Sequence, residues 1–206
     1  MSSPRVALWV KICGMTTPEA VEAALAAGAD AIGFVFAESA RRVTTALARQ
    51  LAAPVRGKAR CVAATRHPEQ AQVEEILAVL RPDALQSDAG DFGHLRLPET
   101  LERLPVVRAW RAGDALPPRL LFEGSISGAG RTCDWDRAAE VARRAQLVLA
   151  GGLDARNVAT AIASVRPFGV DVSSGVETRP GLKDPAEINR FVNAARTAHA
   201  ALQEPT

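Results

Sequence analysis

The sequence predicts an α/β protein in which eight parallel strands close into a barrel. Short apolar runs bounded by turn residues alternate along the chain with segments that begin at helix-capping residues. This alternation predicts a parallel sheet, and eight strands predict a closed one. Glycine-containing turns after residues 146–150 and 168–172 agree, because the (β/α)8 TIM barrel binds phosphate in the loops after its seventh and eighth strands.

The expected strands are continuous apolar runs, as is typical of strands that are buried on both faces. They cover residues 8–12, 31–36, 58–64, 84–86, 104–110, 119–123, 146–150 and 168–172. No linker between them is long enough to separate domains, so we expect residues 1–206 to form one barrel domain. An open doubly wound sheet is the alternative, but no G-x-G-x-x-G follows the first strand to support it.

The expected helices begin at capping residues. Thr17 precedes Pro18, and Asp184 precedes Pro185, which matches the preference for proline in the first helical turn. Helices are expected over residues 17–27, 45–51, 67–81, 134–145, 154–165 and 184–200. A helix near residues 98–103 has a weak pattern, and the proline-rich link before residue 119 shows none. We therefore expect one degenerate or missing helix around the fifth strand.

Composition excludes several classes of protein. The chain is 48% hydrophobic and 23% charged, so it can form a sizeable core. A formal net charge of +2 gives no reason to expect a nucleic acid or a membrane as partner. The N-terminus lacks the apolar segment of a signal peptide, and no apolar run reaches transmembrane length. The three cysteines show no metal-ligand spacing. We expect a cytoplasmic protein without a bound metal.

Polar residues and glycines follow several strands, at the end of the barrel where active sites lie. Glycine in such a turn lets the backbone approach a ligand and direct its N–H groups at it. The two late glycine turns therefore predict a small phosphorylated ligand. The strand-end residues are Cys13, Arg41, Gln86, Asp88, Trp110, Glu123, Gly151, Gly152, Asp171, Ser173, Ser174 and Gly175.

Residues 11–16 read K-I-C-G-M-T, and the chain resembles the phosphoribosylanthranilate isomerase family of tryptophan biosynthesis, whose first strand ends in K-I-C-G-[IM]-T. The resemblance covers nearly the whole chain. Ser39-Ala40-Arg41 stands where the family has S-P-R. The other similar segments are 28–36 (GADAIGFVF), 128–135 (GAGRTCDW, against G-x-G-x-T-x-D-W), 149–153 (LAGGL), 169–177 (GVDVSSGVE) and 180–184 (PGLKD).

The resemblance implies an Amadori rearrangement of N-(5′-phosphoribosyl)anthranilate to its 1-deoxyribulose form, without a metal or redox cofactor. It assigns the general base to Cys13, for which a buried structural cysteine is the alternative. A thiol needs a lowered pKa to act as a base at neutral pH. The family carries its general acid as aspartate in L-L-[LV]-D, where this chain has Glu123. Glutamate can do the same chemistry, but it reaches one methylene further.

The resemblance also implies the binding residues. Arg41 is expected to bind the anthranilate carboxylate, because a guanidinium pairs with a carboxylate through two hydrogen bonds, whereas a solvated surface role suits Arg42 better. Asp171 is expected to face the substrate amine or ribose hydroxyls, or alternatively to fill the barrel as a polar side chain. Asp88 departs from the family, which has a histidine in Q-L-H-G. Gln86 and Asp88 are expected to bind substrate, and Gly151, Gly152, Ser173, Ser174 and Gly175 to bind phosphate.

Two alternatives remain open. One is a different phosphosugar enzyme on the same barrel, which would need a Schiff-base lysine or a metal cluster at the strand ends; Lys11 is expected to face the opposite side of the strand from Cys13. The other is a non-catalytic barrel that binds a phosphorylated molecule without turning it over. In either case the partner is a small phosphorylated molecule. We expect a monomer rather than a dimer.

Overall fold

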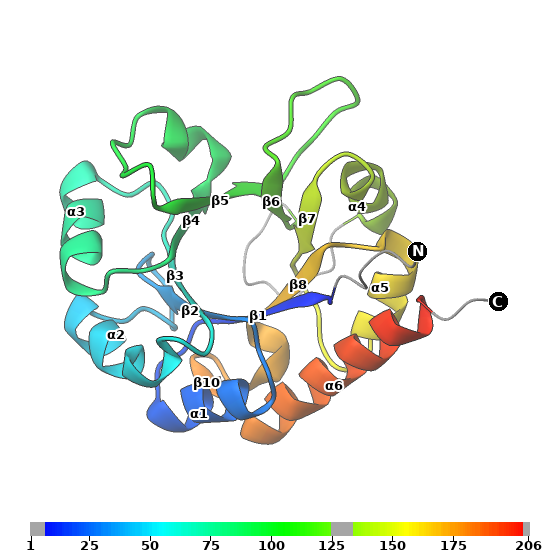
Figure 1. The fold of residues 1–206 in the computed structure, drawn as a ribbon, viewed down its shortest axis with the longest axis horizontal. Coiled ribbons are helices and arrows are strands. Elements are labelled where there is room, and N and C mark those ends of the chain that lie inside the picture. The colour runs from blue at the N-terminus through cyan, green and yellow to red at the C-terminus, as the bar shows by residue number, and fades with distance from the viewer. Residues whose placement is uncertain (1–6, 125–133, 204–206) are drawn as a thin grey trace.

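The computed structural model describes residues 7–124 and 134–203. Its eight parallel strands form a closed barrel in sequence order, with β8 pairing back onto β1 (Figure 1). The predicted (β/α)8 barrel is thereby confirmed. The strands are β1 (Trp9–Cys13), β2 (Ala31–Val35), β3 (Arg60–Ala64), β4 (Ala84–Asp88), β5 (Glu102–Val107), β6 (Arg119–Phe122), β7 (Gln146–Leu149) and β8 (Gly169–Val172).

The α-helices lie outside the ring of strands (Figure 1). The capping residues act as expected: the Thr17 side chain accepts a hydrogen bond from the Ala20 amide, and the Asp184 side chain accepts from Ala186 and Glu187. The helices in the described residues are α1 (Pro18–Ala26), α2 (Thr45–Leu51), α3 (Gln70–Val79), α4 (Trp135–Ala142), α5 (Val158–Val165) and α6 (Pro185–Ala201), with a short 3₁₀ helix η1 (Ala53–Val55) after α2.

The region around the fifth strand differs from the prediction. The prediction of a helix near residues 98–103 is wrong, because β5 begins at Glu102, which pairs with Ala84 of β4. Only a 3₁₀ helix, η2 (Ala89–Gly93), follows β4, and the link of residues 108–118 contains no helix at all. Helices are thus missing after both β4 and β5. Glycines and prolines in these links disfavour a helix, since neither residue is tolerated well inside one.

Successive side chains of β1 point alternately toward the helices outside the barrel and into the barrel interior. Val10 and Ile12 belong to the large apolar core between strands and helices. Trp9 instead packs against a separate apolar cluster that includes Val148 and Leu104. Residues two apart on a strand share a face, so Lys11 and Cys13 also point into the barrel, successively closer to its C-terminal end.

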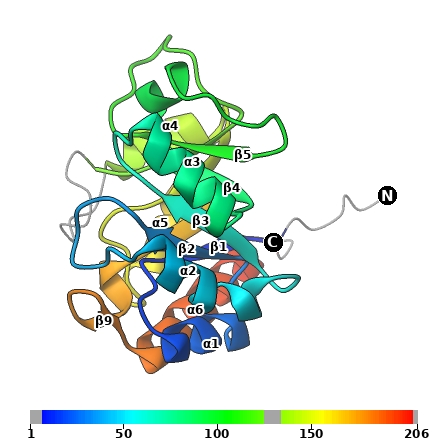
Figure 2. The same ribbon diagram turned by 90° about the vertical axis from the view of Figure 1, so that its left-hand side faces the viewer.

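An unpredicted hairpin follows β8. After a 3₁₀ turn, η3 (Ser174–Val176), the strands β9 (Glu177–Arg179) and β10 (Leu182–Lys183) form a separate antiparallel sheet before α6. In Figure 2 the hairpin, in orange, lies on the same side of the molecule as the loop after β2, in blue. The Thr16 hydroxyl donates to the Gly181 carbonyl over 2.6 Å, which fastens the hairpin to the loop after β1.

Within the described residues, no helix is long and apolar enough to cross a lipid bilayer. In the same part of the chain, no three His, Cys, Asp or Glu side chains are grouped so that they could hold a metal ion.

Candidate active site

Cys13 is the last residue of β1, at the C-terminal end of the strand, and the residue is 6% exposed. Cys13 pairs in register with Gly33 of β2. A Cβ atom built on Gly33 would lie 2.7 Å from the Cys13 Sγ and 3.2 Å from the Lys11 Cε. Glycine at position 33 therefore leaves the space that these two inward side chains occupy.

Lys11 and Asp171 form an ion pair inside the barrel, below Cys13. The Lys11 Nζ donates to the Asp171 Oδ1 over 2.7 Å, and the two residues are register partners on β1 and β8. The expectation that Lys11 faces away from Cys13 is wrong, because residues at positions 11 and 13 lie on the same face of a strand. Asp171 is 8% exposed and is engaged by the protein itself, so it partly takes the expected alternative role of a polar residue filling the barrel.

The charges around Cys13 act on it in opposite directions. Burial raises the pKa of the Cys13 thiol above its ordinary value; the Lys11 ammonium opposes this, and Lys183 does so more weakly. Burial alone would lower the pKa of Lys11, but Asp171 and Cys13 outweigh it and the pKa is raised. Lys11 therefore stays an ammonium, which is the wrong form for a Schiff-base nucleophile. The protein groups around Cys13 therefore do not give it the lowered thiol pKa that a base needs.

Arg41 lies in the loop after β2, and its side chain is 13% exposed. Its Nε donates to the Glu177 Oε1 and its Nη2 to the Glu177 Oε2, each over 2.8 Å. The two-bond pairing expected with a substrate carboxylate is thus seen here with a carboxylate of the protein. Gly14 makes room for this side chain, because a Cβ there would lie 2.7 Å from the Arg41 Cδ.

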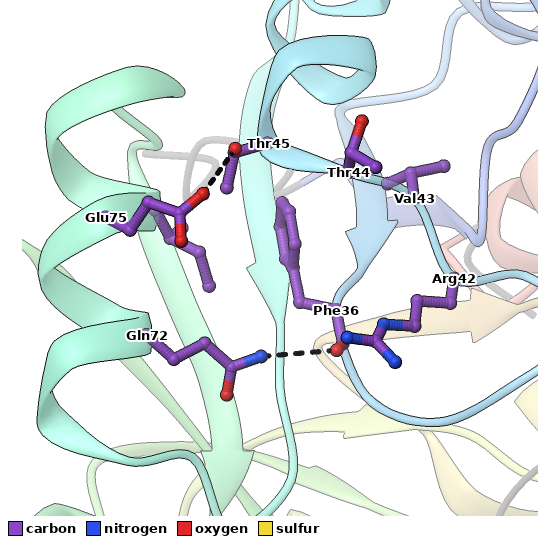
Figure 3. Close-up of a pocket in the computed structure, with 8 residues that line it drawn as sticks. Phe36, Arg42, Val43, Thr44, Thr45, Gln72 and Glu75 are labelled. Carbon is purple, nitrogen blue, oxygen red and sulfur yellow. Dashed lines mark hydrogen bonds between the residues drawn. The ribbon is translucent and has the colours of Figure 1, made fainter.

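Arg42, the next residue, points elsewhere. Its side chain is 55% exposed and pairs with Glu38 over 2.8 Å, the solvated role expected for it. It also lines a cavity of about 370 Å³ between the loop after β2 and helix α3 (Figure 3). In this cavity the Gln72 amide donates to the Phe36 carbonyl, and the Thr45 hydroxyl donates to Glu75. None of the predicted site residues lines it.

Asp88, Arg108 and Glu123 stand at the ends of β4, β5 and β6. The guanidinium of Arg108 donates to the Asp88 Oδ1 through Nη1 and to the Glu123 Oε1 through Nη2, the latter over 2.7 Å. His67 reaches the other oxygen of Asp88 over 3.3 Å. The structure thus joins Asp88 and Glu123 through one cation. The nearby Gln86 Oε1 is buried and has no hydrogen-bond partner among the described residues.

The loops after β7 and β8 meet, as the glycine pattern predicted. Gly151 and Gly152 have φ angles of 89° and 63°, which favour glycine. A Cβ on Gly175 would lie 1.9 Å from the Leu153 carbonyl oxygen, so only glycine permits this approach of the two loops. Ser174 follows in η3 and is half-buried.

The hydroxyl of Ser173 is not directed at this glycine turn. It donates to the Cys13 carbonyl over 3.0 Å and accepts a hydrogen bond from the Lys183 Nζ over 3.1 Å. The ends of β1 and β8 are tied together in this way.

Three charged residues of the site were missed by sequence reasoning. Arg108 directly follows β5, but the strand was expected to run to residue 110, so Trp110 was expected to be its strand-end residue. Trp110 is buried, and its indole N–H donates to the Asp114 carbonyl. Glu177 and Lys183 were noted only as part of similar segments. Their signal was the presence of two charged residues in the segment that follows the expected phosphate turn. Residues 128–133 of the similar segment 128–135 lie outside the described residues.

Comparison with known proteins identifies a family. The family model for N-(5′phosphoribosyl)anthranilate (PRA) isomerase matches residues 10–194. The N-(5′-phosphoribosyl)anthranilate isomerase of Rhizobium etli is 38% identical over 95% of this chain and 97% of its own. A crystal structure of phosphoribosyl anthranilate isomerase in complex with reduced 1-(o-carboxyphenylamino)-1-deoxyribulose 5-phosphate is 29% identical, with a TM-score of 0.76 over 92% of this chain and 99% of that one. A monomeric form of the dimeric Thermotoga maritima isomerase gives 30%, with a TM-score of 0.76 over 92% and 99%.

Proposed function

We propose that this chain, which belongs to the N-(5′-phosphoribosyl)anthranilate isomerase family, converts N-(5′-phosphoribosyl)anthranilate into 1-(2-carboxyphenylamino)-1-deoxyribulose 5-phosphate in tryptophan biosynthesis. The observation that carries the proposal is the position of Cys13, whose thiol points into the C-terminal mouth of the barrel beside two charged lysines. The reaction is a rearrangement within one molecule, and acid–base groups are sufficient for it.

The first step opens the furanose ring, and we assign the proton donor to Glu123. Its carboxylic acid transfers a proton to the ring oxygen, the bond from C1 to that oxygen breaks, and the nitrogen lone pair forms the iminium. A guanidinium favours the carboxylate form, which opposes this role. Asp88 accepts from the same guanidinium and also lies 3.3 Å from His67 and 3.9 Å from Arg66, so Arg108 is shared between the two carboxylates.

The second step removes the proton from C2, and we assign the base to Cys13. The C–H electron pair becomes the C1–C2 double bond, the iminium becomes a neutral enolamine, and tautomerisation gives the ketone. Burial raises the thiol pKa, so the protein alone keeps the thiolate scarce. The iminium produced in the first step places a new positive charge near the thiol and favours the thiolate, in the same sense as the Lys11 ammonium.

The rest of the site supports binding of the two ends of the substrate. Gly151, Gly152 and Gly175 line the meeting point of the loops after β7 and β8, where backbone N–H groups can cradle a phosphate. The Gln86 Oε1, which has no partner in the part of the chain that the structure describes, is suited to accept a hydrogen bond from the substrate amine or a hydroxyl. Asp171, held by Lys11, is proposed to present its remaining oxygen to the ribose hydroxyls.

We also propose that the protein works as a single-domain cytoplasmic monomer. The Thermotoga maritima relative is described as dimeric, so sedimentation of the purified protein is the test, and a dimer would refute this part of the proposal.

The test of the function is turnover. Freshly made phosphoribosylanthranilate should lose its anthranilate fluorescence when the enzyme is added. Cys13→Ala should lower the rate at least about a hundredfold, as expected for the loss of a general base, with the fold retained. Cys61→Ala is the matched control, because Cys61 is the second residue of β3, away from the C-terminal ends of the strands, and burial raises its pKa to about 12. A protein that binds the ligand without turnover is the non-catalytic alternative, and full activity in Cys13→Ala would refute the assigned base.

A further inference from the structure

The β9–β10 hairpin and the loop after β2 share a cluster of three charged side chains, Arg41, Glu177 and Lys183, which we call the Glu177 cluster. The side chains of the three are 13%, 4% and 0% exposed. Glu177 lies at its centre: it accepts two hydrogen bonds from Arg41 and one of 2.8 Å from the Lys183 Nζ. Burial alone would raise the pKa of Glu177, but these two cations hold it below its ordinary value, so Glu177 is a carboxylate.

The ammonium of Lys183 is saturated with protein partners. It donates to Glu177, to the Ser173 carbonyl over 2.9 Å and to the Ser173 hydroxyl over 3.1 Å. Three acceptors require three N–H donors, which only the charged form has. Lys183 therefore has no donor left for a ligand. Its effect is to fix Glu177 relative to the ends of β8 and β1.

The guanidinium of Arg41, in contrast, has N–H donors that no acceptor among the described residues uses. A guanidinium has five N–H groups, and Glu177 uses two of them, one on Nε and one on Nη2. No other acceptor among the described residues engages the side chain. The edge formed by Nη1 and the second N–H of Nη2 is still available, and this edge can bind a second carboxylate through two parallel hydrogen bonds.

The charge of the Glu177 cluster is unbalanced. Two cations face one carboxylate, which leaves one positive charge uncompensated in a largely buried place. The neighbouring charges do not correct this, because Lys11 is paired with Asp171 and burial keeps the Cys13 thiol protonated. An uncompensated buried charge is costly, and an anionic ligand removes that cost.

We propose that Glu177 and Lys183 are positioning residues that hold Arg41 with its free edge toward the carboxylate of the substrate. Glu177 binds the other edge, Lys183 fixes Glu177 to Ser173, and the unbalanced positive charge selects an anionic aromatic group. This inference rests on the proposed function and deepens it, since it assigns carboxylate recognition to a cluster rather than to Arg41 alone. The hairpin is thereby part of the specificity apparatus.

The experiment compares two inhibitors: the reduced product, and the same compound without its ortho carboxylate. The wild-type enzyme should bind the first more tightly. Arg41→Ala, Glu177→Gln and Lys183→Met should each reduce this preference and raise KM, by roughly tenfold to a hundredfold, the range expected for lost charge-assisted hydrogen bonds. The carboxylate-free inhibitor should bind all variants about equally, and kcat should change much less than KM.

Controls separate positioning from a general loss of structure. Arg179→Ala is matched, because Arg179 is an exposed cation on the same strand, β9, and should leave both inhibition constants unchanged. Glu177→Asp keeps the carboxylate and should restore part of the preference that Glu177→Gln loses. Thermal melts identify any variant that does not fold. The preference for the carboxylate-bearing inhibitor is then compared only among the folded variants.

The results distinguish the two proposals. A wild-type protein without turnover would refute the proposed function. An active wild type that prefers the carboxylate-bearing inhibitor, together with folded Glu177→Gln and Lys183→Met variants that keep the full preference, would refute the positioning role alone.

Discussion

Gly33→Ala places a methyl group against the proposed base, and the same methyl group would lie 3.2 Å from the Cε of Lys11. The backbone of Gly33 is an ordinary part of strand β2, so alanine fits it locally. The new Cβ would lie 2.7 Å from the Cys13 Sγ, whereas an ordinary contact is about 3.7 Å. The thiol must move by about 1 Å. A misplacement of this size can cost about a hundredfold in rate, so kcat should fall by about that factor.

The assay is the loss of substrate fluorescence under saturating conditions, with a thermal melt of the same sample. Overpacking costs about 1–3 kcal/mol, which lowers Tm by about 2–4 °C per kcal/mol in a chain of this size. Gly90→Ala is the control, because no atom lies within 4 Å of the Cβ it would add and it should keep wild-type kcat. A folded Gly33→Ala enzyme with wild-type kcat would show that the position of the Cys13 thiol does not limit the reaction.

Four other predictions concern single groups. Glu123→Gln should nearly abolish turnover, since an amide cannot donate the proton, while Glu123→Asp should keep measurable activity because its acid is only about 1.5 Å shorter in reach; wild-type turnover in Glu123→Gln would remove it from the mechanism. Because burial raises the pKa of Cys13, the ultraviolet thiolate absorbance that Cys13→Ser removes should appear only above the ordinary thiol range, and its appearance near neutral pH would contradict this. Inorganic phosphate or the reduced product should slow hydrogen exchange at the amides of Gly152 and Gly175 and raise Tm, unless an analogue without phosphate does so equally. Folding lowers the pKa of Glu177, so its contribution to stability is present above its unfolded pKa of about 4.3 and is lost as the pH falls below that value. The Tm of Glu177→Gln should therefore fall less steeply with acid than the Tm of the wild type. An identical dependence of Tm on acid in the two proteins would contradict the ion pairs.

The barrel itself could be predicted from the sequence because its strands are continuous apolar runs, and each run can be recognised from its own residues. The loops after β7 and β8 were also predictable, since glycine at positions 151 and 152 reports a backbone conformation. One degenerate or missing helix was expected around the fifth strand, whereas an α-helix is missing on both sides of it. The link after β4 has a length that suits a helix, and the glycines that break it lie among residues that look like an ordinary turn.

The charged contacts of the site could not be predicted in the same way. Glu177 meets Arg41 across 136 positions of sequence, and nothing in either neighbourhood specifies the other. The direction of the Lys11 side chain could have been predicted correctly, because residues two apart on a strand share a face and Lys11 is two residues before Cys13. Arg108 was missed because the end of β5 was placed three residues too late, and a strand-end argument depends on that boundary.

The bridge made by Arg108 bears on how this chain can be recombined with its relatives. It joins Asp88 and Glu123, two of the positions where the sequence departs from the motifs of the family it resembles. Replacing Asp88 alone by histidine would leave Arg108 with Glu123 as its remaining strand-end carboxylate partner and change the charge that Glu123 experiences. The two departures are therefore expected to be non-additive in a double-mutant cycle. A chimera between this enzyme and a relative should inherit positions 88, 108 and 123 from one parent.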